Sequence, residues 1–117
     1  MDITGSRDRL VDHLKDARLK GKRLRVVLDL GDINPPCAFV QLDTLDHYNT
    51  GGEVVWRVYL VADFTDQERV VEQLEKLLNA VLEIGTAPAA ATEYVGLPVP
   101  EQSQPLPALL VRISETV

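Results

Sequence analysis

The stretch EVVWRVYLVAD, Glu53–Asp63, decides the fold. Apolar side chains recur at every second position in it, which predicts a β-strand. At about 11 residues the strand is about twice the usual length, and a strand of this length often pairs beyond its own domain. The second face is also fairly apolar, so we expect little water at either face. The first face comprises Val54, Trp56, Val58, Leu60 and Ala62.

The segment that follows, TDQERVVEQLEKLLNAVLEIG (residues 65–85), predicts an amphipathic helix. Thr65 and Glu68 have the spacing of a capping box, in which each side chain caps a backbone N–H of the first turn. Gly85 provides the stop. The apolar stripe that would face a sheet consists of Val70, Val71, Leu74, Leu77, Leu78, Val81 and Leu82.

The N-terminal part predicts a helix and then a strand. Residues 6–20 carry leucine, valine and alanine at helical spacing, with Ser6 as a plausible N-cap and Gly21 as the stop. Residues 24–30 (LRVVLDL) alternate as a strand does. We therefore expect one helix over residues 6–20 and one strand over residues 24–30.

The Pro-Pro pair in INPPCAFVQL (residues 33–42) separates two strands. Proline cannot donate to a strand ladder, so it lies where a strand starts or at an edge. Residues 31–36 therefore predict a turn, and CAFVQL (residues 37–42) a strand. The polar, glycine-containing segment DTLDHYNTGG (residues 43–52) predicts a loop. Together with the strand at Glu53–Asp63 it predicts a long hairpin whose tip projects from the body.

The C-terminal part predicts two further strands, ATEYVGL (residues 91–97) and PALLVRIS (residues 107–114). The order of elements is therefore α-β-β-β-α-β-β. With hairpin-type links this order predicts an α+β fold, a mostly antiparallel sheet with two helices packed on one face. The length of 117 residues fits a single α+β domain over residues 1–117.

Charge is distributed unevenly along the chain. The net charge is −6, yet residues 1–25 hold 8 of the 12 Lys and Arg residues and 4 of the 18 Asp and Glu residues, which makes that part +4 and the remainder −10. The acidic bulk argues against general nucleic-acid binding. A basic cluster could contact a phosphate or an acidic partner, but we favour a solvated helix end; oppositely charged ends also suit head-to-tail contact between copies. The cluster is Arg18, Lys20, Lys22, Arg23 and Arg25.

No motif for catalysis or for a cofactor is found in the sequence. Cys37 with His47 would be a nucleophile and a base, but a strand cysteine acting as a small hydrophobe is the interpretation we favour. Asp43, Asp46 and His47 offer metal-ligand chemistry, yet loop carboxylates are usually solvated. We expect no catalytic, cofactor or metal residues. With one cysteine, no long apolar run and a charged N-terminus, we expect a protein made in a cytoplasm and not bound to a membrane.

Several features occur in a particular order along nearly the whole chain. An N-terminal helix and a strand precede a Pro-Pro run (Pro35–Val40), and a glycine-containing loop leads to a Trp-bearing strand that ends in Asp (Trp56–Asp63). A capped helix follows, then an extended piece with Tyr94 and a last strand that begins at Pro107-Ala108. This order resembles that of the small tail-terminator and tail-completion (minor tail) proteins of long-tailed bacteriophages.

The resemblance implies a structural role in a virion, without catalysis. Such proteins form a homo-hexameric ring that caps the tail tube, stops its growth and contacts the head-neck connector, while DNA passes through the channel without specific binding. Alternatives that stay open are another neck component, such as a head-completion or stopper protein, and a small ligand-binding or regulatory domain of a bacterial host. The residues we assign to the subunit or tube interface are Asp46, His47, Tyr48, Arg57 and Tyr59.

Overall fold

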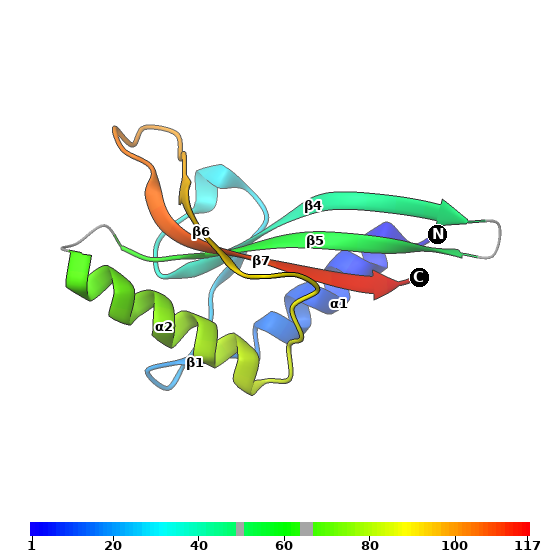
Figure 1. Ribbon diagram of the computed structural model, residues 1–117, viewed down its shortest axis with the longest axis horizontal. Coiled ribbons are helices and arrows are strands. Elements are labelled where there is room, and N and C mark those ends of the chain that lie inside the picture. The colour runs from blue at the N-terminus through cyan, green and yellow to red at the C-terminus, as the bar shows by residue number, and fades with distance from the viewer. Residues whose placement is uncertain (49–50, 64–66) are drawn as a thin grey trace.

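The computed structural model describes residues 1–48, 51–63 and 67–117. A five-stranded sheet with the order β3-β4-β5-β7-β6 forms its centre, and a two-stranded hairpin, β1–β2, lies apart from it. Figure 1 shows the sheet running along the long axis, with both helices beside it. The elements are α1 Ile3–Leu14, β1 Arg18–Leu19, β2 Lys22–Arg23, β3 Val26–Val27, the 3-10 helix η1 Leu30–Asp32, β4 Cys37–Tyr48, β5 Gly51–Val61, α2 Gln67–Glu83, β6 Glu93–Leu97 and β7 Leu106–Thr116.

The pairing of the strands makes the sheet mostly antiparallel. β4 with β5, β5 with β7 and β6 with β7 are antiparallel pairs, whereas β3 pairs with β4 in parallel. Within the main sheet and the two α-helices, the order along the chain is α-β-β-β-α-β-β. The α+β fold and the order of elements predicted from the sequence are therefore confirmed.

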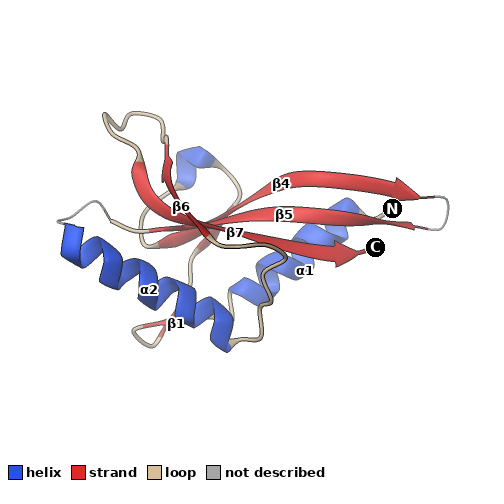
Figure 2. Cartoon of the chain, in the orientation of Figure 1, coloured by secondary structure: helices blue, strands red, loops and turns tan. Residues whose placement is uncertain are grey.

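Both helices pack on one face of the sheet, as predicted (Figure 2). The alternation in β5 places Trp56, Val58 and Leu60 on this face, and none of these side chains is more than 5% exposed. Leu10 and Leu14 of α1 and most of the apolar stripe of α2 complete the same cluster. Val71 and Leu82, which the sequence placed in this stripe, are instead 55% and 41% exposed. The members from α2 are Val70, Leu74, Leu77, Ala80 and Val81.

A second, smaller cluster fills the opposite face at one end of the sheet. It is built from the even-numbered positions of β7 and the odd-numbered ones of β4 and β5, which alternate with the helix-facing residues. Partly buried side chains before β4 and around β6, such as Leu30 and Val95, pack against it. Its buried members are Val27, Cys37, Phe39, Val61, Leu97, Leu106 and Ala108.

The helix predicted over residues 6–20 is shorter and begins earlier. Asp2 is the N-cap, and its carboxylate accepts a hydrogen bond from Gly5 N at 2.9 Å, so Ser6 lies inside α1 and caps nothing. Lys20 and Gly21 have φ values of 54° and 79°. Two successive positive φ values suit a two-residue hairpin turn, and the chain there forms the β1–β2 hairpin instead of a fourth helical turn.

Two further predictions on local structure were wrong. The strand predicted over residues 24–30 is reduced to β3, because the Asp29 carboxylate accepts from Gly31 N at 2.8 Å and starts η1. Residues 43–48 form no loop but extend β4 to Tyr48, since β5 supplies a paired strand for their polar side chains. The hairpin therefore exists, and it consists of strands almost to its tip.

The predicted start and stop of the second helix differ in their outcome. Gly85 has φ 87° and follows the end of α2, so the predicted glycine stop is confirmed. Thr65, the first residue of the predicted capping box, lies outside the described residues.

Candidate functional site

The distal halves of β4, β5 and β7 form a three-stranded ribbon that extends away from α2 (Figure 1). β3 pairs with β4 only at Ala38 and Phe39, and β6 pairs with β7 only as far as Leu110. Beyond these points, no described residue adds a further strand to β4 or to β7. The β4 edge of the ribbon is therefore open, and the β7 edge is open beyond Arg112, whose carbonyl oxygen accepts a hydrogen bond from Ala89 N at 2.7 Å. α1 contacts the middle strand. Open edges are templates for pairing with another chain.

Exposed leucines lie along the β4 edge. Leu42 and Leu45 share the helix-facing side of β4, opposite Trp56 and Val54, yet they are 43% and 41% exposed. Leu28, 46% exposed, lines the same hollow beside α1 as Leu42, a hollow of about 340 Å³. We call Leu28, Leu42 and Leu45 the edge patch. Apolar side chains grouped at an open strand edge are typical of a surface that another protein covers.

A β-bulge organises the opposite face of the ribbon. The register of β4 shifts between Leu42 and Thr44, and the Asp43 side chain there is only 11% exposed. Its two carboxylate oxygens contact Arg57 Nε and Arg112 Nε, each at 3.1 Å. Arg112 also contacts Glu93 at 3.5 Å. These ion pairs tie β4, β5, β7 and β6 together, and bulges of this kind often set the direction of one side chain.

The five side chains assigned to an interface from the sequence fall into two groups. Asp46, His47 and Tyr48 are exposed at the distal end of β4, and Asp46 and Tyr48 lie on the face that the helices leave open. Arg57 and Tyr59 lie on that same face farther along β5, whereas His47 points to the helix side. The structure does not bring the five into one cluster.

Arg57 and Tyr59 both have partners within the chain. The Tyr59 ring stacks on Phe39 with centroids 5.8 Å apart. The pKa of Arg57 is raised, first by a side-chain hydrogen bond with Tyr59 and then by the charge of Asp43. Arg57 is therefore a fixed cation within the ribbon. Sequence reasoning considered Asp43 only as a metal ligand and missed its ion pairs with Arg57 and Arg112. It also missed the edge patch, whose signal is a pair of leucines in an otherwise polar segment.

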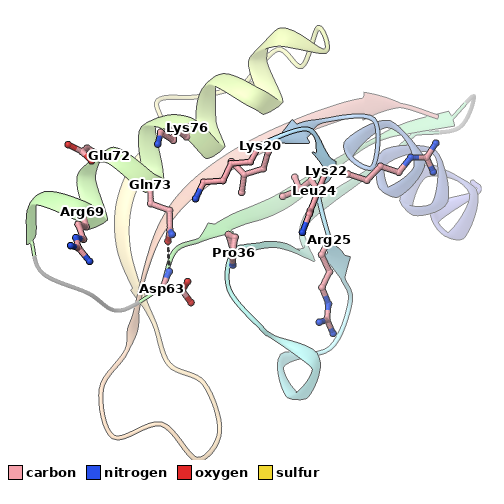
Figure 3. Close-up of a pocket in the computed structure, with 12 residues that line it drawn as sticks. Lys20, Lys22, Leu24, Arg25, Pro36, Asp63, Arg69, Glu72, Gln73 and Lys76 are labelled. Atoms are coloured by element: carbon pink, nitrogen blue, oxygen red, sulfur yellow. Dashed lines mark hydrogen bonds between the residues drawn. The ribbon is translucent and has the colours of Figure 1, made fainter.

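A basic cleft of about 480 Å³ lies in the other half of the molecule, between the β1–β2 hairpin and α2. Figure 3 shows Lys20 on the hairpin near Lys76 on the helix. Of the basic residues predicted at a solvated helix end, all but Arg25 are on this hairpin, and all but Arg18 line the cleft together with side chains of α2. Its charged lining residues are Lys20, Lys22, Arg23, Arg25, Arg69 and Lys76, with Asp63 and Glu72.

Cys37 and His47 do not form a catalytic pair. They lie at opposite ends of β4, on the order of 30 Å apart for ten residues of extended chain. Cys37 is fully buried, and burial raises the pKa of its thiol above the ordinary value of 9.0. Among the residues the structure describes, no group of three or more His, Cys, Asp or Glu side chains is arranged to hold a metal ion.

The buried thiol of Cys37 is expected to be unreactive in the folded protein. Burial makes the pKa of this thiol higher in the folded protein than in the unfolded chain. Its contribution to stability is therefore complete at pH values below the unfolded pKa and is lost as pH rises through the folded pKa. With Ellman's reagent at pH 8, we expect the native thiol to react at least about a hundredfold more slowly than the same thiol in guanidinium. Equal rates would contradict the burial of Cys37.

The sequence matches no protein-family model and shows significant similarity to no curated protein. Among the described residues, no helix is long and apolar enough to cross a membrane. The geometry of the ribbon and of the basic cleft therefore carries the functional interpretation.

Proposed function

We propose that this chain is a structural protein of a bacteriophage virion, a tail terminator. In this role copies of the chain assemble as a homo-hexameric ring on the end of the tail tube and join it to the head-neck connector, and DNA passes through the channel without specific binding. The proposal rests on the resemblance in the order of elements and on one structural observation. That observation is the ribbon with two open edges and an apolar patch along one of them.

The two open edges support assembly from copies of one chain. The β4 edge and the β7 edge lie on opposite sides of β5, so they are different surfaces of the same molecule. A contact between two different surfaces is heterologous, and repeated around an axis it generates a ring if the rotation closes. Burial of the edge patch at such a contact would add hydrophobic stabilisation, which backbone hydrogen bonds along a strand edge do not provide.

The test combines purified protein with polymerised tail-tube protein from the same phage and examines the tubes by negative-stain microscopy. We expect a ring at one end of each tube and a fixed tube length once the ring is bound. Changing Leu42 and Leu45 together to lysine should abolish the ring, because two charges would replace the apolar edge. Both side chains are more than 40% exposed, so the free energy of unfolding should change by about 1 kcal/mol or less.

The matched control changes Val71 and Leu82 to lysine. These are exposed apolar residues of α2, at 55% and 41%, so the chemical change is the same but lies on the other half of the molecule. The control should still form rings. Rings that survive the Leu42 and Leu45 changes but disappear in the control would contradict the assignment of the interface to the ribbon.

A comparison of binding targets separates the tail terminator from another neck component. A terminator binds tail tubes that are offered alone, whereas a head-completion or stopper protein binds DNA-filled heads that are offered alone. Binding to heads only would replace the proposal by the neck alternative. Binding to neither, with a stable monomer at all concentrations, would favour the small ligand-binding domain.

A further inference from the structure

The basic cleft holds more positive charge than the chain itself neutralises. Apart from Arg69, its lining contains five cationic and two anionic side chains. Arg25 donates a hydrogen bond to the Asp32 carbonyl oxygen at 3.1 Å, a neutral acceptor. Within the described part of the chain, Lys20, Lys22 and Lys76 make no ion pair, and all three are exposed. A cleft of this composition attracts carboxylates or phosphates.

The distal end of the ribbon is negatively charged, and two of its carboxylates have no ion-pair partner among the described residues. Asp46 on β4 and Glu53 on β5 are direct cross-strand neighbours, so their carboxylates share one face. Like charges in this position destabilise a strand pair. Neither side chain makes an ion pair with any residue that the structure describes. We call these two residues the acidic pair.

The acidic pair and the basic cleft lie far apart in the molecule. The longest dimension of the chain is 49 Å. In Figure 1 the distal end of the β4–β5 hairpin lies at one end of this axis, and the β1–β2 hairpin lies beside α2 in the other half. One copy therefore cannot join the two within itself.

We propose that the basic cleft of one copy receives the acidic pair of the next copy. This inference rests on the proposed function and names a contact between ring subunits. Lys22 and Lys76, from opposite sides of the cleft, would provide the cations for Asp46 and Glu53. The contact is heterologous, because cleft and pair are different surfaces, and it therefore repeats from copy to copy. Opposite charges also steer the encounter and fix its orientation.

The charge distribution favours a second copy over other anions. Nucleic acid requires an extended basic face, whereas this chain has a net charge of −6. A small phosphate would neutralise the positive charge of the cleft, but the repulsion between the two carboxylates of the acidic pair would remain. Asp63 and Glu72 in the cleft lining also oppose a dense polyphosphate, while two separate carboxylates leave space between them. Of these occupants, only the acidic pair of a second copy both neutralises the cleft and relieves the repulsion within the pair.

The experiment is a charge exchange in the full chain. A cleft variant carries Lys22→Glu and Lys76→Glu, and a pair variant carries Asp46→Lys and Glu53→Lys. Each variant alone places like charges at every contact, so we expect self-association at least about tenfold weaker than in the unchanged protein, measured by sedimentation velocity in low salt. In an equimolar mixture each contact again joins opposite charges, so association should return. The association of the unchanged protein should weaken as salt is raised.

The matched control for the pair variant carries Asp12→Lys and Asp16→Lys, which makes the same change in net charge at two exposed positions outside the cleft and the ribbon. Its association should stay within about twofold of the unchanged protein. Circular dichroism checks that each variant is folded. Self-association of the pair variant at the level of the control would overturn the proposal, and so would a mixture of folded variants that does not associate.

Further outcomes separate this contact from the proposed function. If the mixture regains association but no protein caps tail tubes, the contact stands and the terminator role fails. If rings form on tubes and both charge-reversed variants form them equally well, the role stands and this contact fails. Inorganic phosphate that binds the cleft at low concentration without weakening self-association would identify a small-anion site and overturn the proposal. An unchanged protein that never self-associates would also overturn it.

Discussion

Replacing Trp56 with alanine is expected to lower the free energy of unfolding by about 3–5 kcal/mol. Trp56 is 5% exposed and lies on the helix-facing side of β5. Its indole Nε1–H donates a hydrogen bond to Ser6 Oγ at 3.0 Å, and Ser6 is fully buried inside α1. The Ser6 hydroxyl also donates to Glu115 Oε2 of β7 at 3.0 Å. The substitution therefore leaves a cavity and removes one of the polar contacts that hold α1 on the ribbon.

Urea unfolding followed by circular dichroism measures this effect, because Trp56 is the sole tryptophan and its fluorescence disappears with it. Ser6→Ala is the matched variant, since it keeps the ring in place and leaves the indole N–H without its partner. It should cost about 1–3 kcal/mol, less than the loss of the whole side chain. A loss below about 1 kcal/mol in Trp56→Ala would mean that α1 does not pack on β5 as described.

Leu77→Ala is expected to lower the free energy of unfolding by about 2–5 kcal/mol. Leu77 is fully buried in the apolar stripe of α2, within the cluster that joins this helix to the sheet. Its removal leaves a cavity between two rigid layers that close only in part. The same urea titration measures the change.

Leu82→Ala on the same helix is the control for Leu77→Ala. Leu82 is 41% exposed, so the same chemical change there should cost about 1 kcal/mol or less. Equal losses for the two substitutions would show that the helix is turned relative to the face assigned to it. A larger loss at Leu82 than at Leu77 would place the sheet on the other side of α2.

The main elements could be predicted from the sequence because their patterns are local. Alternation along Glu53–Asp63 reflects one strongly buried and one half-buried face of β5, and the leucine and valine stripe reflects the face of α2 that meets the sheet. The errors occur where a side chain overrides the pattern. Asp2 starts α1 four residues earlier than the predicted cap, and the Asp29 carboxylate replaces a strand by η1.

The extension of β4 through residues 43–48 was missed for a different reason. These residues read as a loop because most of them are polar and exposed, and polar composition alone does not distinguish a solvated strand from a loop. Their strand conformation comes from pairing with β5, a contact that composition does not encode. The prediction of a projecting hairpin was confirmed, because the apolar runs on both sides of the polar segment identify its two strands.

The candidate site was predicted only in part. The sequence placed Asp46, His47 and Tyr48 at the end of a projecting hairpin, and the structure places them on the exposed distal part of β4. The bridge from Asp43 to Arg57 and Arg112 joins residues up to 69 positions apart and depends on a bulge, so no local pattern indicates it. The basic cleft likewise depends on the packing of the β1–β2 hairpin beside α2.

The ribbon, the edge patch, the basic cleft and the acidic pair lead to one account of this protein. The two open strand edges are different surfaces of one molecule, and so are the basic cleft and the acidic pair. Contacts between different surfaces repeat from copy to copy. A ring of such copies would have its interfaces completed, whereas a single copy leaves its leucines and its charges exposed. Self-assembly is therefore the central claim, and the role at the end of a tail tube depends on it.

Native mass spectrometry of the unchanged protein, over a range of concentrations and in the presence of tail tubes, tests this claim most directly. A ring of six chains of 13.0 kDa has a mass of about 78 kDa. We predict that this species dominates at high concentration or when it is released from tubes, and that it dissociates to the single chain on dilution. A single 13.0 kDa species under all of these conditions would contradict the account.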